Sequence, residues 1–119
     1  MSQSGEISVM MVEGVLLVAV PPSPADETIA TLQEDVLKAM QERRAKGLIL
    51  DIATVEILDS FFARTLSETA QMVALMGGKT VITGMRPSVA ITATELGLQM
   101  GHTLTALNVD RALLRLRHG

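Results

Sequence analysis

The sequence predicts an α/β domain with a mixed, mostly parallel β-sheet and about four helices. Short apolar segments alternate with longer segments whose apolar residues recur at helical spacing, in the order β-β-α-β-α-β-α-β-α. This alternation favours right-handed crossovers between parallel strands. Because 119 residues suit one hydrophobic core, we expect a single domain over residues 1–119.

The first two predicted strands, residues 7–12 and 15–20, form an antiparallel hairpin, since only Glu13-Gly14 separates them. A helix is predicted next, with Ser23 as its N-cap, Pro24 at its first helical position and Gly47 as its stop signal. One helical face carries the apolar residues Ile29, Leu32, Val36, Ala39 and Met40.

The second half of the chain continues the alternation. Strands are predicted at residues 48–52, 79–83 and 103–107. The helix after Ser60 carries its apolar face on Phe62, Leu66, Ala70, Val73 and Met76. Further helices begin at Arg86-Pro87 and at Asn108, and the last of them is predicted to pack inward through Leu113, Leu114 and Leu116.

Composition excludes several classes of function. A net charge of −3 gives no basic footprint for nucleic acid, and two aromatic residues provide no platform for stacking bases. The absence of cysteine excludes disulfides and thiolate metal sites. We expect no membrane span, because no apolar run reaches about 18 residues. The start of the sequence lacks a basic signal-peptide region, so we expect a cytoplasmic protein.

Ser60 is the main candidate functional residue, because it lies where a helix pattern begins. Unpaired backbone N–H groups and the helix dipole favour negative charge there, including a phosphate on the serine hydroxyl. The structural alternative is a simple helix cap, for which Ser60 and Asp59 are both suitable. A serine nucleophile would need a base, and neither His102 nor His118 lies in a recognisable triad context.

Two further interpretations concern nearby residues. Asp51 and Asp59 could form a carboxylate pair for acid–base chemistry or Mg²⁺, but two acids without a third ligand make a weak metal site, so we expect no metal or cofactor. Phe61 points about 100° away from Phe62, so it is either exposed at a protein interface or packed under a neighbouring helix.

Three of the methionines are predicted to fill the core: Met40, Met72 and Met76.

The strand LILDI, followed by Asp59-Ser60 at a helix start, resembles the STAS domain of anti-anti-sigma factors. The segments DSFFARTL and LMGGKTVITGMRPSVAITATELG are similar, more narrowly, to the small STAS-only scaffold proteins of the bacterial stressosome. The resemblance covers essentially the whole chain. The broader pattern has a small residue and a glycine after Asp-Ser, where this chain has Phe61 and Phe62, and this departure favours the scaffold branch.

The resemblance implies a non-enzymatic scaffold that sequesters a serine/threonine switch kinase of the GHKL type. Phosphorylation of Ser60 would release the kinase to start stress signalling, and a phosphatase would reset the serine. It also implies co-assembly with a sensor STAS paralogue, so a homodimer or higher oligomer is expected. The switch neighbourhood and partner-binding surface would comprise Asp59, Phe61, Asp51 and Arg86, and Thr92 is a candidate second phosphosite.

Two other functions remain open from the sequence. One is an anti-anti-sigma factor that binds an anti-sigma factor kinase. The other is a module that binds a small ligand or nucleotide through Asp51 and the segment from Thr83 to Arg86.

Overall fold

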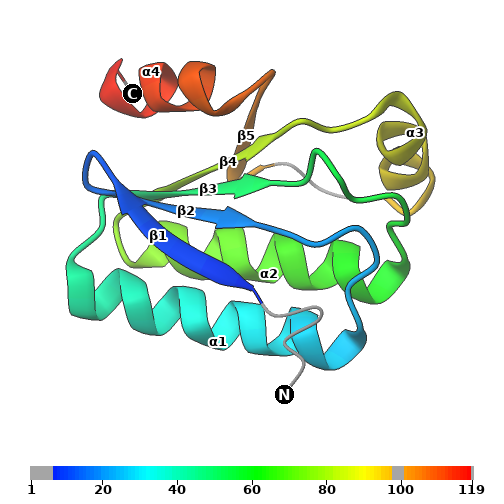
Figure 1. Cartoon of the computed structure of the whole chain (residues 1–119), viewed down its shortest axis with the longest axis horizontal. Helices are drawn as coiled ribbons and strands as arrows, with labels where there is room; N and C mark the ends of the chain where they lie inside the picture. Colours follow the sequence, from blue (N-terminus) through cyan, green and yellow to red (C-terminus); the bar gives the residue numbers. More distant parts are fainter. Residues whose placement is uncertain (1–6, 98–100, 119) are drawn as a thin grey trace.

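The computed structural model describes residues 7–97 and 101–118, and its elements follow the predicted order (Figure 1). The strands are β1 (Ser8–Val12), β2 (Val15–Ala19), β3 (Gly47–Asp51), β4 (Lys79–Thr83) and β5 (Thr103–Ala106). The helices are α1 (Asp26–Arg43), α2 (Ser60–Leu75), α3 (Pro87–Glu95) and α4 (Val109–His118).

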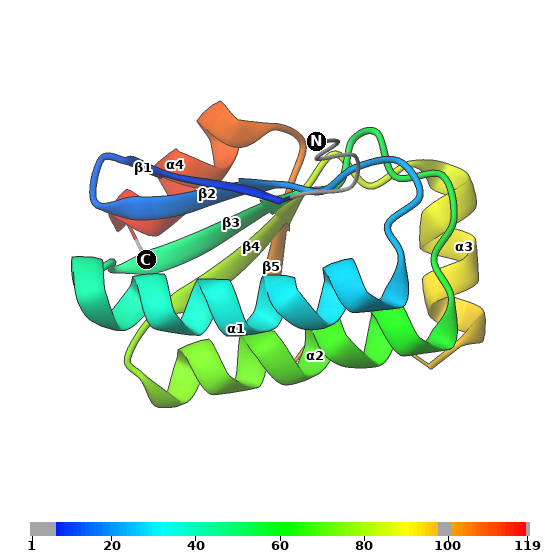
Figure 2. The same cartoon turned by 60° about the horizontal axis from the view of Figure 1, so that its bottom comes forward.

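The five strands form one sheet in the order β1-β2-β3-β4-β5. The hairpin strands β1 and β2 pair antiparallel, while β2, β3, β4 and β5 pair parallel with one another. This arrangement confirms the predicted α/β class, the mixed sheet and the hairpin at its edge. It also brings the carboxyl ends of β2, β3 and β4 to one end of the molecule, where the segments leading into α1, α2 and α3 begin (Figures 1 and 2).

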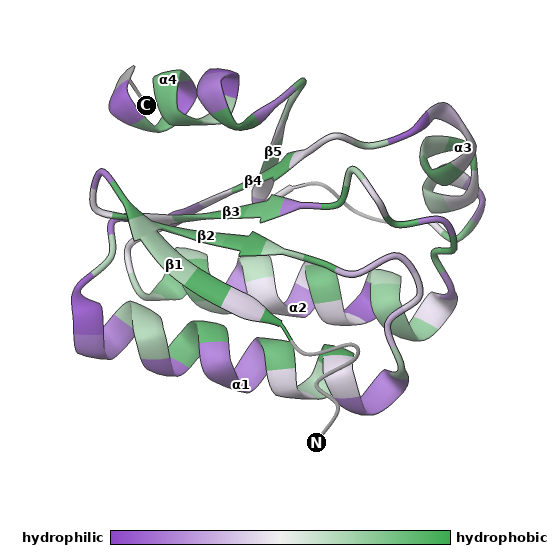
Figure 3. Cartoon of the chain, in the orientation of Figure 1, coloured by the Kyte–Doolittle hydropathy of each residue, from purple (hydrophilic) through white to green (hydrophobic). Residues whose placement is uncertain are grey.

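Helices cover both faces of the sheet. Helices α1 and α2 lie side by side under one face and α4 lies on the other, while α3 stands at the end where β4 finishes (Figures 1 and 2). Because successive side chains of a strand point to opposite faces, Leu48 and Leu50 join the core under α1 and α2, whereas Ile49 joins the smaller core under α4. The strands are largely apolar, and the face of α1 that points away from the sheet is polar (Figure 3).

The apolar stripe of α1 is buried as predicted, but both predicted ends of the helix are wrong. Ser23 is not the N-cap: Ala25 takes that position, and its carbonyl accepts the N–H of Ile29. At the other end the chain turns at Arg44, which adopts a left-handed φ of 51°. Gly47 therefore does not stop the helix; it lies in β3, where a Cβ atom would meet the Lys79 carbonyl oxygen at 2.9 Å.

Three predicted core residues lie at the surface instead. Met40 is buried as expected, but Met72 is 38% exposed, because it points about 100° away from the buried Val73. Met76 is 46% exposed, because α2 ends at Leu75 and Met76 is its C-cap. In α4, Leu113 packs against the smaller core and Leu116 is half-buried, whereas Leu114 is 45% exposed. Leu114 directly follows Leu113 in the helix, so it points about 100° away from it.

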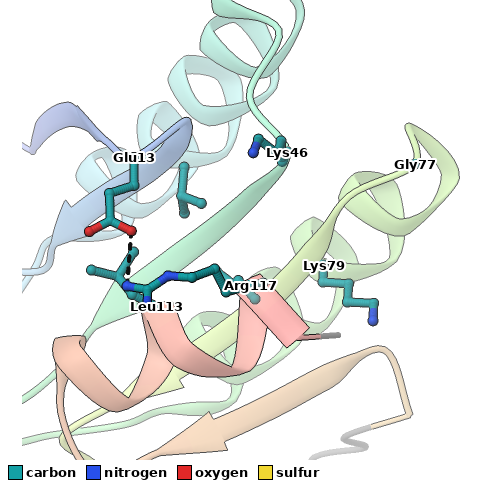
Figure 4. Close-up of a pocket in the computed structure, with 8 residues that line it drawn as sticks. Glu13, Lys46, Gly77, Lys79, Leu113 and Arg117 are labelled. Atoms are coloured by element: carbon teal, nitrogen blue, oxygen red, sulfur yellow. Dashed lines mark hydrogen bonds and ion pairs between the residues drawn. The ribbon is translucent and has the colours of Figure 1, made fainter.

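A hollow of about 200 Å³ lies at the amino ends of the parallel strands, beneath the end of α4 (Figure 4). An ion pair of 3.1 Å between Arg117 and Glu13 spans its edge and ties α4 to the β1–β2 turn. Both side chains are about half exposed to solvent. This hollow is at the opposite end of the strands from the start of α2, so it is separate from the region around Ser60.

Within the part of the chain that the structure describes, no helix is long and apolar enough to cross a membrane.

Candidate functional site

The segment between β3 and α2, residues 52–59, positions Ser60. Val55 and Leu58 are buried in the main core and anchor this segment from below. Hydrogen bonds tie it to the ends of both neighbouring strands: Ile52 N–H to the Thr83 carbonyl, Thr54 Oγ1 to the Val20 carbonyl, and Glu56 N–H to the Pro22 carbonyl. A loop held by its own core residues and by two neighbours keeps its conformation, so Ser60 is presented at a fixed place.

Asp59, and not Ser60, caps α2. The Asp59 carboxylate accepts a hydrogen bond of 2.9 Å from the Phe62 N–H, and its carbonyl accepts the N–H of Ala63. Ser60 is therefore the first residue inside the helix, and its side chain is exposed. Because Asp59 takes over the structural role, the Ser60 hydroxyl is left available for modification at the positive end of the helix dipole.

Phe61 is partly exposed and partly packed, so each of the two positions predicted for it, at an interface or under a neighbouring helix, is correct in part. Its side chain is half-buried and packs against the main core, while the Arg64 guanidinium lies 5.8 Å from the centre of its ring. Ile57, two residues before Asp59, is 65% exposed. The sequence pattern did not single out Ile57 as a surface residue, although the signal was its place between Val55 and Leu58, which are both buried.

Arg86 braces the loop rather than facing Ser60 directly. As the N-cap residue of α3, it donates a hydrogen bond of 3.0 Å from Nε to the Ala53 carbonyl. Gly84, with a φ of 76°, lies so close to this loop that an added Cβ would stand 2.7 Å from the Ala53 Cβ. The segment after β4 thus fixes the segment after β3, and Arg86 contacts the loop before Ser60 through Ala53.

Asp51 lies apart from the Asp59–Phe61 group. One of its carboxylate oxygens accepts the Ala53 N–H at 3.0 Å, and the side chain lines a hollow of about 350 Å³ with the first residues of α4, on the sheet face opposite α2. Asn108 and Asp110 also line this hollow, and its lining contains no cationic side chain. Two carboxylates without a cation disfavour a nucleotide phosphate, so this geometry does not support the ligand-binding alternative.

The remaining candidates from the sequence are placed as follows. Thr92 is half-buried within α3, and its hydroxyl donates to the Ser88 carbonyl at 3.1 Å. His102 lies in the turn before β5 and makes no hydrogen bond to Ser60, and the side chain of His118 lies outside the described residues. Among residues 7–97 and 101–118, no group of three acidic or histidine side chains is placed to hold a metal ion.

Comparison with known proteins identifies the family of this fold. The model of the STAS domain family matches residues 6–112. A serine-to-glutamate variant of RsbS from Moorella thermoacetica superposes with a TM-score of 0.85 and 33% identity, covering 94% of this chain and 95% of the other. A chain of the solved molecular architecture of the stressosome, a signal integration and transduction hub, gives a TM-score of 0.79 and 34% identity over 93% of this chain and 96% of the other.

Curated relatives match over a shorter part of their own length. The RsbT co-antagonist protein RsbRB of Bacillus subtilis is 29% identical over 80 residues, which are 67% of this chain and 29% of the relative. The co-antagonists RsbRA and RsbRD are covered to a similar extent, so this chain spans about a third of the length of these relatives.

Proposed function

The chain belongs to the STAS domain family, and on that premise we propose that it is a stressosome scaffold protein that holds a switch kinase until Ser60 is phosphorylated. The observation that supports this proposal most strongly is that two neighbouring residues have different roles at the start of α2. Asp59 caps the helix through the Phe62 N–H, which leaves the exposed Ser60 hydroxyl without a structural task. The similarity to RsbS along almost the whole chain supports the same assignment.

The proposed activity is binding rather than catalysis, in keeping with the non-enzymatic members of this family. The partner is a serine/threonine kinase of the GHKL type. The kinase transfers the γ-phosphoryl group of ATP to Oγ of Ser60, which loses its proton, and ADP leaves. A phosphatase then hydrolyses the phosphoserine and restores the binding-competent protein.

The kinase-binding surface that we propose consists of Ile57, Asp59, Ser60 and Phe61, and we call it the switch surface. It combines an exposed apolar side chain with a half-buried aromatic ring, a composition common at the centre of protein interfaces. The loop beneath it is held by Val55, Leu58 and the Arg86–Ala53 hydrogen bond, so the surface is formed before the partner arrives.

Phosphorylation would change this surface more than the fold. A phosphoserine adds about −1.5 to −2 charges at pH 7. The first-turn N–H groups and the helix dipole can accept this charge locally, so α2 should remain folded. A kinase docked on the same surface would instead meet new charge beside Asp59, and repulsion together with desolvation weakens such a complex.

We also propose that the chain co-assembles with a sensor STAS paralogue of the co-antagonist type. The support is its similarity to the STAS-sized portion of the RsbT co-antagonists and to a chain of the stressosome structure. Size-exclusion chromatography of the two proteins mixed should give one large species that neither forms alone. Separate elution of the two proteins at every mixing ratio would contradict the assembly.

The functional test is a pull-down of the kinase with Ser60→Ala and Ser60→Asp variants, followed by intact-mass analysis of the unchanged protein after incubation with kinase and ATP. We expect Ser60→Ala to retain the kinase and Ser60→Asp to lose it, and we expect the added phosphate to map to Ser60. Equal retention by both variants, or a phosphate mapped elsewhere, would overturn the proposal.

A further inference from the structure

We propose that Arg64 is the second component of the switch: when Ser60 is phosphorylated, the Arg64 guanidinium leaves the Phe61 ring and pairs with the phosphate, which uncovers the ring. This inference rests on the proposed phosphorylation of Ser60 and assigns the side chain that donates hydrogen bonds to the phosphate. Its basis is the position of three side chains in the first two turns of α2.

The helix places Arg64 within reach of a phosphate on Ser60. The two residues are four positions apart, and side chains at this spacing are neighbours on one helical face, with about 5–6 Å between Cβ atoms. Both side chains are exposed, so no packing prevents their approach. An acidic group placed amino-terminal to a basic one at this spacing also has the more favourable order along the helix.

In the unmodified protein Arg64 is held by a weak contact. Its guanidinium lies 5.8 Å from the Phe61 ring centre, and within residues 7–97 and 101–118 it forms no ion pair. Glu68, one turn further along, is the same distance from Arg64 in sequence as Ser60, yet the two do not pair. A cation–π contact at the protein surface gains little, whereas a guanidinium and a phosphate form paired, charge-assisted hydrogen bonds.

The residues beside Ser60 carry negative charge, so a phosphate there would be stabilised by a nearby cation. Asp59 precedes the phosphate directly, and its carboxylate is already engaged as the helix cap. Glu56 is exposed in the same loop. The adjacent Asp59 carboxylate raises the energy of the modified state, and Arg64 is the one cationic residue of α2, a single helical turn from Ser60.

The consequence is a change of surface chemistry that exceeds the added charge. Before modification, a partner meets a positive guanidinium over the half-buried Phe61 ring. After modification, it meets a neutralised arginine, an uncovered ring and a phosphate. A kinase that recognises the guanidinium seated over the ring no longer meets that pair, so Arg64 couples phosphorylation to release.

The test uses protein with phosphoserine incorporated directly at position 60, so that no kinase is needed. The second pKa of the phosphate is followed by ³¹P NMR in the otherwise unchanged protein and in the Arg64→Gln, Arg64→Lys and Arg115→Gln variants. Arg115 is an exposed arginine of α4, on the other side of the sheet, and serves as the matched control. Circular dichroism of each variant establishes that it is folded.

We expect the phosphate pKa to be lowest with Arg64 present, higher in Arg64→Lys and highest in Arg64→Gln, with no change in Arg115→Gln. The Phe61 ring proton shifts should also move on phosphorylation, and this movement should be lost in Arg64→Gln. A phosphate pKa that is the same with and without Arg64 overturns the inference. Because no kinase takes part, this result is independent of whether the pull-down supports kinase release.

Discussion

The Asp59 carboxylate and the Phe62 N–H form a 2.9 Å hydrogen bond that caps α2 and places Ser60 as the first helical residue. Replacing Asp59 with alanine removes this bond, and we expect the free energy of unfolding to fall by about 1 kcal/mol. Urea denaturation followed by circular dichroism measures the change. Asp59→Asn is the matched control, since asparagine caps equally well, and a loss as large as that of alanine would contradict the capping role.

Gly84 and Ala53 approach so closely that the loop before α2 depends on the missing side chain. Gly84→Ala combines a left-handed φ of 76° with a Cβ only 2.7 Å from the Ala53 Cβ. We expect a loss of about 2 kcal/mol or more. Gly97→Ala is the control, because Gly97 has a similar φ of 71° but open space around it, so it should lose only about 1 kcal/mol. Equal losses in thermal unfolding would show that the contact with Ala53 has no importance.

Ile57 is the residue of the switch surface whose role can be separated from folding. Because it is 65% exposed, Ile57→Ser should change the free energy of unfolding by less than about 0.5 kcal/mol. Its loss from an interface should nevertheless weaken kinase binding about tenfold. Isothermal titration calorimetry measures the affinity.

Leu75→Ser provides the comparison for Ile57. Leu75 is 83% exposed at the far end of α2, about 22 Å along the helix axis from Ser60. Its replacement should leave kinase affinity unchanged. If both serine variants bind as tightly as the unchanged protein, Ile57 does not contribute to the surface.

The ion pair between Glu13 and Arg117 should contribute little to stability. Both side chains are about half exposed, and such surface pairs are worth about 0–1 kcal/mol and are screened by salt. Glu13→Gln should therefore lower the free energy of unfolding by less than about 1 kcal/mol, and the difference should shrink in 1 M salt. A larger loss that persists at high salt would indicate a structural role beyond a surface pair.

Much of the fold could be predicted from sequence because its signals are local. The alternation of strand and helix patterns, Pro87 at the start of α3 and Asn108 as the cap of α4 each depend on a few adjacent residues. The position of α4 on the opposite sheet face was not contained in any such pattern. It follows from how the sheet and its two cores fill space, which requires the whole chain.

The errors have the same physical origin. Ser23 has good capping chemistry, but the preceding segment is drawn over the β3–α2 loop, where the Pro22 carbonyl accepts the Glu56 N–H. Gly47 looked like a helix stop, whereas close packing against Lys79 and Leu116 requires it to lack a side chain. In both regions the deciding contacts, Pro22 with Glu56 and Gly47 with Lys79, join residues more than 25 positions apart, which sequence spacing does not reveal.

The candidate site was predictable in part. The Asp59-Ser60 pair was identified by its place at a helix start, and the structure then separated the capping residue from the exposed hydroxyl. Asp51 was grouped with them because it ends a strand, but its side chain lies toward α4. Arg64 attracted no notice in the sequence, because its contact with Phe61 becomes visible only once α2 is built.

The central claim is that phosphorylation of Ser60 releases the kinase, and the affinity of the purified kinase for two forms of the protein tests it most directly. One form is unmodified and the other carries phosphoserine at position 60. We predict that the phosphorylated form binds at least about a hundredfold more weakly in calorimetry, a difference of about 2.8 kcal/mol. Equal affinity of the two folded forms would contradict the account.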